Sequence, residues 1–411
     1  MNADGIKAQR LLSQGERFSP RASVLARLIA PGFQTILDRV DAGLERGSLF
    51  AQLPDGTTRL LGGRAPGFEV EVELKQWRAL VRLATNGSIG WYQAYEAGEW
   101  ATDDKVALFA LFSDNVRALG NTARPSGPFK WAVRLAHWLN RNDRRGAARN
   151  ITAHYDLGND FYRAWLDPSM TYSSALELSD EDLSAGQQRK LRSIAARLGD
   201  AERVLEIGCG WGSLAQLLVQ RGAEVAAISL SEEQLIWARR NCSPEIDFCQ
   251  SDYRDITGVY DAVACVEMVE ALGRENWDGF LQCVNRRLRP GGRAALQYIS
   301  MADDLFEAYA GTVDFIQACI FPGGLLIKSS EFRQLAERRG FSWRDHDSFG
   351  HDYAETLRIW RQRFSEACSE GLLPSGFDER FVALWDYYLA YCEGGFRAGN
   401  INVHQVTLVK T

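Results

Sequence analysis

From residue 150 onward, short apolar runs alternate with segments in which apolar positions recur every three or four residues. The short runs predict strands and the periodic segments predict helices. Strands are predicted at 203–207, 224–229, 246–250, 260–266 and 293–299, and helices near 213–221, 232–241 and 275–289. Pro290-Gly291-Gly292 is expected to break the chain between the last helix and the next strand. This alternation predicts an α/β fold with a doubly wound, mostly parallel sheet that binds ligands at the carboxyl ends of its strands.

The end of the chain continues the pattern with two aromatic-rich helices at 355–370 and 378–392 and a closing strand at 405–409. The region before residue 121 differs. It has helical spacing at 23–46 and near 105–119, and strand patterns at 49–53, 58–61 and 70–74, the first two joined by the hairpin signal Asp55-Gly56. Because 411 residues exceed what one core usually serves, we expect a smaller α+β domain at 1–121, a linker at 122–149 and an α/β domain at 150–411.

The predicted linker is basic and aromatic, although the whole chain has a formal net charge of −6. The segment contains seven basic residues and a single acid, Asp143. The basic residues are interleaved with Phe129, Trp131 and Trp138. The basic residues are Arg124, Lys130, Arg134, Arg141, Arg144, Arg145 and Arg149. Such a segment can lie on an anionic membrane surface, where each basic residue contributes about 1 kcal/mol. A solvated helix face that joins two domains is the alternative, and the negative net charge argues against general nucleic-acid binding.

Cysteine usage and hydropathy place the chain among cytoplasmic proteins. The first 20 residues are polar, and no apolar run reaches the length that spans a bilayer. The eight cysteines form no C-x-x-C pair and begin only at Cys209. This pattern is typical of a reducing compartment and implies neither a disulfide framework nor a metal site.

The most specific motif is the sequence E-x-G-x-G-x-G at residues 206–212, where a predicted strand breaks into a glycine turn that opens a helix. Gly208, Gly210 and Gly212 would let the backbone pass close to a nucleotide. The dinucleotide fingerprint G-x-G-x-x-G places a pyrophosphate on the helix N-terminus. Here Glu206 precedes the glycines, where it would repel a pyrophosphate but attract the cationic amino group and sulfonium of S-adenosylmethionine. A strand-turn-helix without a ligand is the alternative.

Further candidate cofactor contacts follow the next two strands. Ser231 and Gln234 could supply hydrogen bonds to a ribose, since no acid stands at the end of the second strand. Ser231 could instead be only a helix cap, and Gln234 only a surface residue. Asp252, followed by Tyr253, stands after the third strand, where an acid can accept a hydrogen bond from an adenine amino group; a turn residue is the other interpretation.

These motifs occur together with several others in a fixed order. The others are Asn150-Ile151, His154-Tyr155-Asp156-Leu157-Gly158-Asn159-Asp160-Phe161-Tyr162, Met170-Thr171-Tyr172-Ser173, Ile320-Phe321-Pro322-Gly323-Gly324, Phe349-Gly350-His351-Asp352-Tyr353 and Phe396-Arg397. With them the chain resembles the cyclopropane fatty-acyl-phospholipid synthases and their mycolic acid methyltransferase relatives. The resemblance runs from about residue 150 to the end, with weaker similarity around Gly98-Glu99-Trp100.

The resemblance implies transfer of the methyl group of S-adenosylmethionine to a carbon of a cis double bond in a phospholipid acyl chain. It also implies that Tyr172, Ser173 and Trp211 contact the cofactor and that the N-terminal domain associates with lipid. An alkene is a poor nucleophile, so a dry cleft must orient it, and aromatic faces could stabilise the resulting carbocation. Candidate aromatics are Tyr172, Trp211, Phe315, Phe321 and Tyr353, for which core packing is the alternative. His154 is expected to organise its loop rather than act as a base.

In ring-forming members of the family that the chain resembles, a bound bicarbonate removes a proton from the new methyl. Glu270, the backbone of Ile299 and Tyr353 match the expected anion ligands. The other three positions depart from the family pattern: Ser174 replaces a Cys, Ala271 replaces a His, and Gln297 replaces a second His. Ser174 and Gln297 can still hydrogen-bond an anion, but Gln297 cannot titrate. Glu270 could also be a structural carboxylate, and Gln297 an ordinary polar residue near a strand end.

Two products are therefore open, a cyclopropane and a methyl-branched or methylated unsaturated chain. Two other classes compete with both: a small-molecule methyltransferase, and a lipid-binding protein without catalysis. The glycine turn suits the first competitor but leaves the His-Tyr-Asp motif unexplained, and the intact cofactor motif argues against the second. We expect the protein to contact the inner face of the cell membrane and to form a homodimer.

Overall fold

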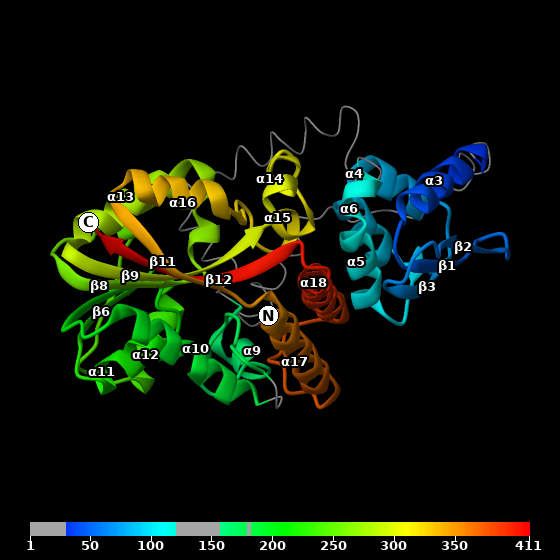
Figure 1. Cartoon of the computed structure of the whole chain (residues 1–411). Coiled ribbons are helices and arrows are strands. Elements are labelled where there is room, and N and C mark those ends of the chain that lie inside the picture. Colours follow the sequence, from blue (N-terminus) through cyan, green and yellow to red (C-terminus); the bar gives the residue numbers. More distant parts are fainter. Residues whose placement is uncertain (1–29, 121–156, 179–181) are drawn as a thin grey trace.

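The computed structural model describes residues 30–120, 157–178 and 182–411, and Figure 1 shows how they are arranged. The first part of the predicted helix at 23–46, the basic linker at 122–149 and the His154-Tyr155-Asp156 motif lie outside these residues. The described residues form two sheets, a large one with helices on both faces and a small one in the N-terminal domain.

The large sheet has the order β11-β12-β9-β8-β5-β6-β7. The short strand β10 pairs with the last residues of β9, Ser300 and Met301. Its strands are β5 (Arg203–Ile207), β6 (Glu224–Ser229), β7 (Asp247–Gln250), β8 (Tyr260–Val266), β9 (Leu288–Met301), β10 (Ile327–Lys328), β11 (Phe341–Ser348) and β12 (Ile401–Lys410). The strands from β7 to β9 are parallel, and β12 is antiparallel to both of its neighbours. The predicted doubly wound, mostly parallel α/β fold is confirmed.

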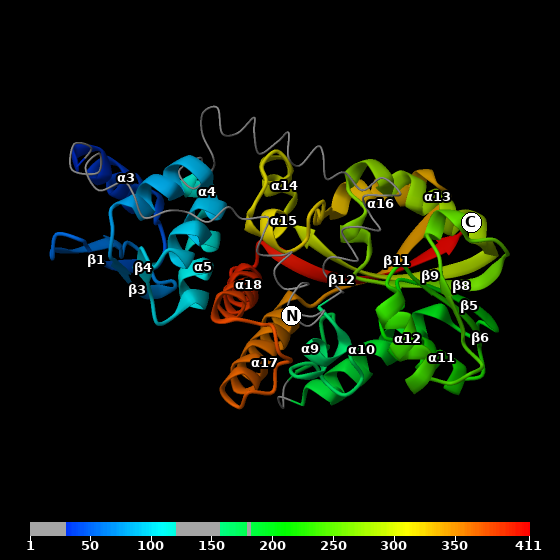
Figure 2. The same ribbon diagram turned by 180° about the vertical axis from the view of Figure 1, so that it is seen from behind.

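Helices cover both faces of this sheet, which explains why its central strands are almost continuously apolar. On one face lie α10 (Leu183–Leu198), α11 (Ser213–Gln220) and α12 (Glu232–Asn241), and on the other α13 (Trp277–Arg287) and α16 (Ser329–Arg338) (Figures 1 and 2). Two separate clusters of buried side chains form, one under each layer. The switch of strand order at β5 leaves the carboxyl ends of β5, β6 and β8 open to a ligand.

One local prediction is wrong. The Pro290-Gly291-Gly292 segment does not separate a helix from a strand, because β9 already begins at Leu288 and continues through it. The register with β8 shifts there, from Tyr260 opposite Leu288 to Ala262 opposite Arg293. Gly291 has φ +73°, a conformation that glycine adopts without strain, so the three residues form an irregularity within the strand.

The N-terminal domain contains a four-stranded sheet with the order β2-β1-β3-β4. Its elements are α3 (Ala30–Gly43), β1 (Ser48–Gln52), β2 (Thr58–Gly62), β3 (Glu69–Leu74), α4 (Arg78–Glu96), β4 (Trp100–Ala101), α5 (Lys105–Asp114) and α6 (Val116–Leu119). The predicted hairpin is confirmed, since β1 and β2 pair antiparallel. Helix α4 was not predicted, because glycines and polar residues interrupt its pattern; Gly87, with φ +58°, kinks it.

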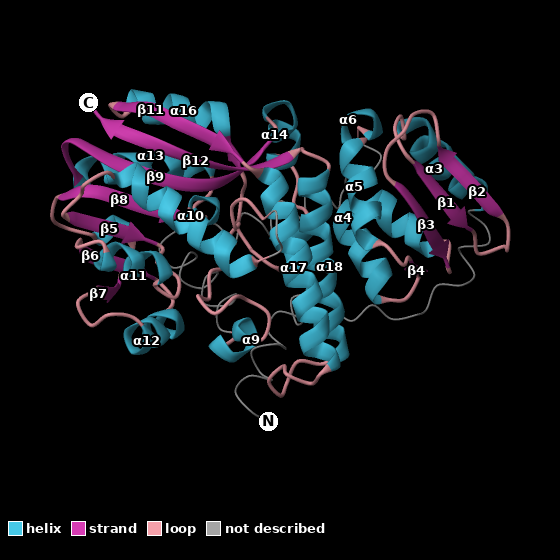
Figure 3. Ribbon diagram, turned by 60° about the horizontal axis from the view of Figure 1, so that its bottom comes forward, coloured by secondary structure: helices cyan, strands magenta, loops and turns pink. Residues whose placement is uncertain are grey.

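A helical layer joins the N-terminal domain to the large sheet (Figure 3). It consists of α17 (Gly350–Ser369) and α18 (Glu379–Arg397), with α9 (Asn159–Arg163), α14 (Asp303–Ala310) and α15 (Phe315–Cys319) beside them. Helix α18 packs against α17 on one side and against α5 on the other. Gly394 permits the second contact, since a Cβ atom there would lie 2.6 Å from Cβ of Phe109 and 2.8 Å from the backbone nitrogen of Ala110.

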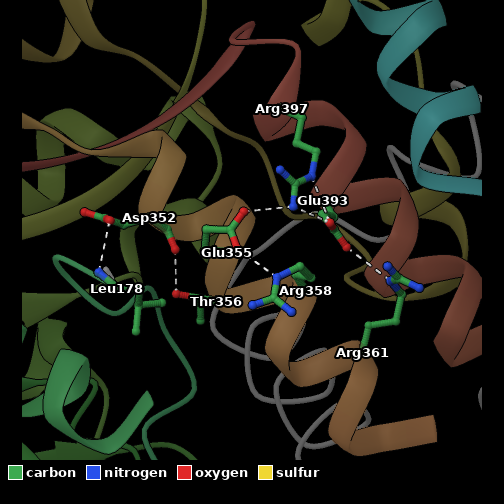
Figure 4. Close-up of polar contacts among 8 residues, drawn as sticks. All are labelled: Leu178, Asp352, Glu355, Thr356, Arg358, Arg361, Glu393 and Arg397. Atoms are coloured by element: carbon green, nitrogen blue, oxygen red, sulfur yellow. Dashed lines mark hydrogen bonds and ion pairs between the residues drawn. The ribbon is translucent and has the colours of Figure 1, made fainter. Parts of the chain in front are cut away.

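Polar contacts fix α17 against α18, as Figure 4 shows. The buried carboxylate of Glu393 accepts hydrogen bonds from Nε of Arg361 at 3.1 Å and Nε of Arg397 at 2.9 Å. The same helix α17 anchors the loop before α10. The backbone N–H of Leu178 donates to the Asp352 carboxylate, and that of Ala175 donates to the Thr356 hydroxyl at 3.1 Å. The loop that carries Ser173 and Ser174 is thereby held in place.

Gly394→Ala should destabilise the protein, because the added methyl would force α5 away from α18. Overpacking of this kind costs about 1–3 kcal/mol. The matched control is Gly279→Ala on α13, where a Cβ meets no atom within 4 Å; alanine there should stabilise its helix by up to about 1 kcal/mol. Denaturant unfolding measures both changes, and equal stability of the two variants would contradict the proposed close contact.

Candidate active site

Two cavities meet at the carboxyl edge of the large sheet. The first, of about 160 Å³, lies over the ends of β5, β6 and β8. The second, of about 440 Å³, lies between this edge, the helical layer and the N-terminal domain. Tyr172, Glu267 and Ala271 line both cavities. The two spaces are therefore adjacent, and these three residues mark the junction.

Nine of the eleven predicted cofactor residues line the first cavity. They are Tyr172, Ser173, Glu206, Gly208, Gly210, Trp211, Gln234, Asp252 and Tyr253. The other two, Gly212 and Ser231, are not among its lining residues. The residue pattern thus brings one set of side chains from four separate segments to one place.

The glycines of the turn have different roles. Gly208 and Gly210 have φ +82° and +53° and line the cavity, and a Cβ on Gly210 would meet no atom within 4 Å. A Cβ on Gly212 would lie 2.8 Å from the Phe248 ring. Packing of α11 against β7 therefore requires glycine at 212, whereas Gly210 leaves space for a ligand.

Glu206 provides an unpartnered carboxylate oxygen in the first cavity. Its side chain is buried, and its Oε2 atom has no hydrogen-bond partner among the described residues. Burial raises the pKa of Glu206 to about 8, against the backbone N–H of Ala215 and the charge of Lys190, which both lower it. A buried carboxylate with an unpartnered oxygen favours a cationic ligand group, and the amino group of S-adenosylmethionine would be such a group.

Lys190 is a site residue that the sequence pattern did not reveal. Its side chain is fully buried on α10, lines the first cavity, and donates from Nζ to the Ser173 hydroxyl at 2.7 Å. Burial lowers the pKa of Lys190 to about 8, although Glu267, Asp167 and Glu206 favour its charged form. The available signal was the helical spacing of Leu183, Leu191 and Leu198, which places this lysine on the apolar face.

Aromatic side chains of the first cavity are held by hydrogen bonds. Trp211 donates from Nε1 to Asn159 Oδ1 at 2.7 Å, so the glycine turn is tied to α9. The hydroxyls of Tyr172 and Tyr388 lie 2.8 Å apart, and both residues line the second cavity. Tyr172 therefore has a fixed position between the two spaces.

The predicted ribose and adenine contacts take more complex arrangements. Ser231 caps α12 by accepting from the backbone N–H of Gln234 at 3.3 Å, as its alternative interpretation expected. Gln234 accepts from the Ser229 hydroxyl at 3.0 Å and lines the cavity, so it is not a surface residue. Asp252 forms an ion pair with Arg254, with N–O distances of 2.8 and 2.6 Å. This pair leaves further acceptor capacity on its carboxylate.

The second cavity is predominantly apolar and aromatic. Its aromatic lining residues are Trp91, Phe109, Phe112, Tyr172, Tyr309, Phe321, Tyr353, Tyr387, Tyr388, Tyr391 and Phe396. Helices α4, α5 and α6 contribute Leu83, Trp91, Phe109 and Val116, so the N-terminal domain forms one wall. Among the five aromatics proposed to face a carbocation, Phe315 is instead part of the core, where it packs against Tyr92 and Tyr387.

The residues predicted to bind an anion converge on Glu267, which sequence reasoning missed. Its Oε1 accepts from the backbone N–H of Ser174 at 3.0 Å and from Nε2 of Gln297 at 2.6 Å. Its Oε2 accepts from the Tyr353 hydroxyl at 2.7 Å. The Ser174 hydroxyl turns away and donates to its neighbour, the Ala175 carbonyl. The available signal was an acid directly after the buried strand β8, at the edge where ligands bind.

Glu270 and Ile299 lie next to this cluster and line the second cavity. The backbone N–H of Ile299 donates to Glu270 Oε1 at 2.5 Å, while Oε2 has no partner among the described residues. Burial, together with the nearby charge of Glu267, raises the pKa of Glu270 to about 8. All five predicted catalytic residues are thus gathered around the junction, although Ser174 and Gln297 reach it through Glu267.

Comparison with known proteins gives consistent matches. Residues 142–406 match the family described as mycolic acid cyclopropane synthetase. A tuberculostearic acid methyltransferase, UfaA1 of Mycobacterium tuberculosis, is 37% identical over 358 residues, which are 80% of either chain. The cyclopropane-fatty-acyl-phospholipid synthase of Escherichia coli strain K12 is 34% identical over 354 residues, 84% of this chain and 88% of that one.

Solved structures give the same result. The crystal structure of mycolic acid cyclopropane synthase CmaA1, complexed with SAH and CTAB, matches with a TM-score of 0.60 at 27% identity. The match covers 64% of this chain and 98% of that one. The part of the chain beyond this match is accordingly an addition to the fold that the two share.

Glu206→Gln should weaken binding of S-adenosylmethionine about 10- to 100-fold, because a hydrogen bond to a charged group is worth about 1.5–3 kcal/mol. Calorimetric titration of the purified protein measures the change. Glu224→Gln, at the exposed start of β6, is the matched control and should bind as the wild type does. Equal affinity of both variants would remove Glu206 from the cofactor site.

Proposed function

The chain belongs to the mycolic acid cyclopropane synthetase family, and we propose on that premise that it methylates a carbon of a cis double bond in a phospholipid acyl chain. The methyl donor is S-adenosylmethionine. The observation that carries the proposal is the junction of a polar cavity and a larger apolar cavity at Tyr172, Glu267 and Ala271. A donor in the first cavity and an acyl chain in the second would meet there.

The residues of the first cavity fit S-adenosylmethionine. Glu206 offers a buried carboxylate oxygen to its amino group, and Gly210 leaves room beside the backbone. Gln234 and Asp252 stand where hydroxyl and amino groups of the nucleoside can hydrogen-bond. When bound, this group supplies an electrophilic methyl. Lys190 offsets part of the negative charge of Glu206 and Glu267.

The second cavity suits an acyl chain. A volume of about 440 Å³ with mostly apolar walls is typical of a site for an extended hydrophobic ligand. An alkene reacts only when it is oriented against the donor and kept dry. Tyr172, Phe321 and Tyr353 line this space, and their ring faces can stabilise positive charge on the chain. A small polar methyl acceptor would leave this cavity without a purpose.

The fate of the carbocation on the acyl chain decides the product. Loss of a proton from the new methyl closes a cyclopropane, while loss from a neighbouring chain carbon leaves a methylated alkene. The E. coli relative is named for the first outcome. The second, without ring closure, is our alternative, because a relative with higher identity is named a tuberculostearic acid methyltransferase. A saturated methyl-branched chain would require, in addition, a hydride from a separate reaction.

A phospholipid substrate brings the enzyme to a membrane surface. No described helix combines the length and apolar character that crossing a bilayer requires. We propose peripheral contact with the anionic inner face of the cell membrane through the basic segment 122–149, which lies outside the described residues. The homodimer remains a prediction.

Expression of the protein in a bacterial host with monounsaturated phospholipids and no cyclopropane synthase of its own should add about 14 mass units to acyl chains, as expected for addition of a methyl and loss of a proton. Gas chromatography with mass spectrometry measures this product and separates a cyclopropane from a methylated alkene. Host cells that express Glu206→Gln are the control. An unchanged acyl profile with folded protein would contradict the proposal.

Val116→Phe should shift the accepted acyl chains toward shorter lengths, because the larger side chain fills part of the second cavity from its N-terminal wall. The measurement is turnover of phospholipid vesicles that carry unsaturated chains of different length. Ala118→Phe, on the exposed side of the same helix α6, is the matched control. Identical chain-length profiles for the two variants would exclude this wall from the substrate site.

A further inference from the structure

Glu267 is the acid at the junction of the two cavities. Among the described residues that line both spaces, only Glu267 has a carboxyl group, since the other two are Tyr172 and Ala271. Any atom that passes from a donor in the first cavity to an acyl chain in the second does so beside this carboxyl group. Its location therefore suits a group that handles a proton of the product.

Three hydrogen-bond donors fix both oxygens of this carboxyl. They are the backbone N–H of Ser174, the Gln297 amide and the Tyr353 hydroxyl, at 3.0, 2.6 and 2.7 Å. Three donors stabilise the ionised form of a carboxyl group. Each donor is itself positioned: Gln297 accepts from Gln405 at 3.0 Å, and Tyr353 lies on α17, which also holds the Ser174 loop. The donors and the charge of Lys190 favour the ionised carboxylate, against burial, which raises the pKa of Glu267.

The backbone at Glu267 is strained in support of this placement. Its φ of +47° lies in the left-handed region, which is unfavourable for a residue with a long side chain. Its position is fixed because it directly follows strand β8, whose last residue pairs with β9, and because its N–H donates to the Gln297 carbonyl at 2.8 Å. A glycine would adopt this conformation without cost.

Glu270 differs from Glu267 in its donors. It accepts a single hydrogen bond, from the Ile299 N–H, and its second oxygen has no partner among the described residues. Two neighbouring buried carboxyls cannot both remain ionised at little cost. The larger number of donors therefore favours the negative charge on Glu267 and the proton on Glu270.

We propose that Glu267 is the general base of the reaction, a built-in carboxylate that replaces the free bicarbonate expected from the resemblance. This inference rests on the proposed function. The methyl carbon bonds to one alkene carbon as its bond to sulfur breaks, and the other alkene carbon becomes a cation. A C–H bond of the new methyl, or of the chain carbon next to the cation, then breaks. Its electron pair closes the ring in the first case and forms a double bond in the second, and its proton passes to a Glu267 oxygen and later to water.

The donors around Glu267 leave little for a free anion. The Ser174 segment, Gln297 and Tyr353 are three of the five groups expected to hold bicarbonate, and all three donate to Glu267 instead. The other two, the Ile299 N–H and Glu270, bond to each other. A free anion at this place would also lie against the charge of Glu267. The enzyme should therefore work without bicarbonate.

The test uses the purified full-length enzyme, S-adenosylmethionine and vesicles of unsaturated phospholipid in buffer freed of carbon dioxide. Wild-type turnover should be the same with and without added bicarbonate. Glu267→Gly should bind S-adenosylmethionine within about twofold of wild type but lose at least 100-fold in kcat, and added bicarbonate or formate should restore at least 10-fold. Glu267→Gln keeps the space filled and should stay inactive with either anion. Glu275→Ala, on the exposed surface nearby, should behave as wild type.

Three results would overturn the inference: wild-type turnover that needs bicarbonate, a glycine variant with full activity, or a folded glycine variant that no anion restores. The bicarbonate dependence of the wild type decides the matter even if both variants fail to fold. A wild-type enzyme that methylates no lipid under either condition would instead contradict the proposed function, so the two failures are distinguishable.

Discussion

Ionisable groups buried beside an apolar cavity must find their partners within the protein, and this constraint organises the active site. Glu206, Glu267, Glu270 and Lys190 all lie at the carboxyl edge of the large sheet, away from bulk water. Their arrangement resolves the constraint in three ways. Glu267 takes three donors, Lys190 supplies a compensating charge, and Glu206 keeps an oxygen for a cationic ligand. A buried charge without a partner is costly. These partners therefore allow the surrounding helical layer and N-terminal wall to be apolar.

The sequence predicted the architecture well where local patterns coincide with tertiary position. Strands β5, β6 and β8 begin and end where the apolar runs do, because a parallel sheet buried on both faces selects continuous apolar runs. The sequence did not predict helix α4 or the early start of β9. Glycine occurs inside both elements, and packing overrides local propensity there. Neither feature has a simple period in the sequence.

The candidate site was predictable in its members but not in its connections. The acid before the glycine turn and the residues matched through the resemblance all lie around the cavities. The sequence could not show that Gln297 and Tyr353 donate hydrogen bonds to the Glu267 side chain. Glu267 and Lys190 were missed because a charged residue is expected to be solvated until the fold shows both its burial and its partners.

One wall of the larger cavity is contributed by a different stretch of chain from the residues at the junction of the two cavities. Helices α4 to α6 end before residue 121, whereas Glu206, Glu267 and Tyr353 follow far along the chain. This wall can accordingly diverge without changing the residues at the junction of the two cavities, although the rest of the larger cavity comes from the same stretch as they do. A chimera that exchanges residues 30–120 between two such enzymes would exchange this wall alone, provided that the tight approach of α5 to Gly394 is preserved.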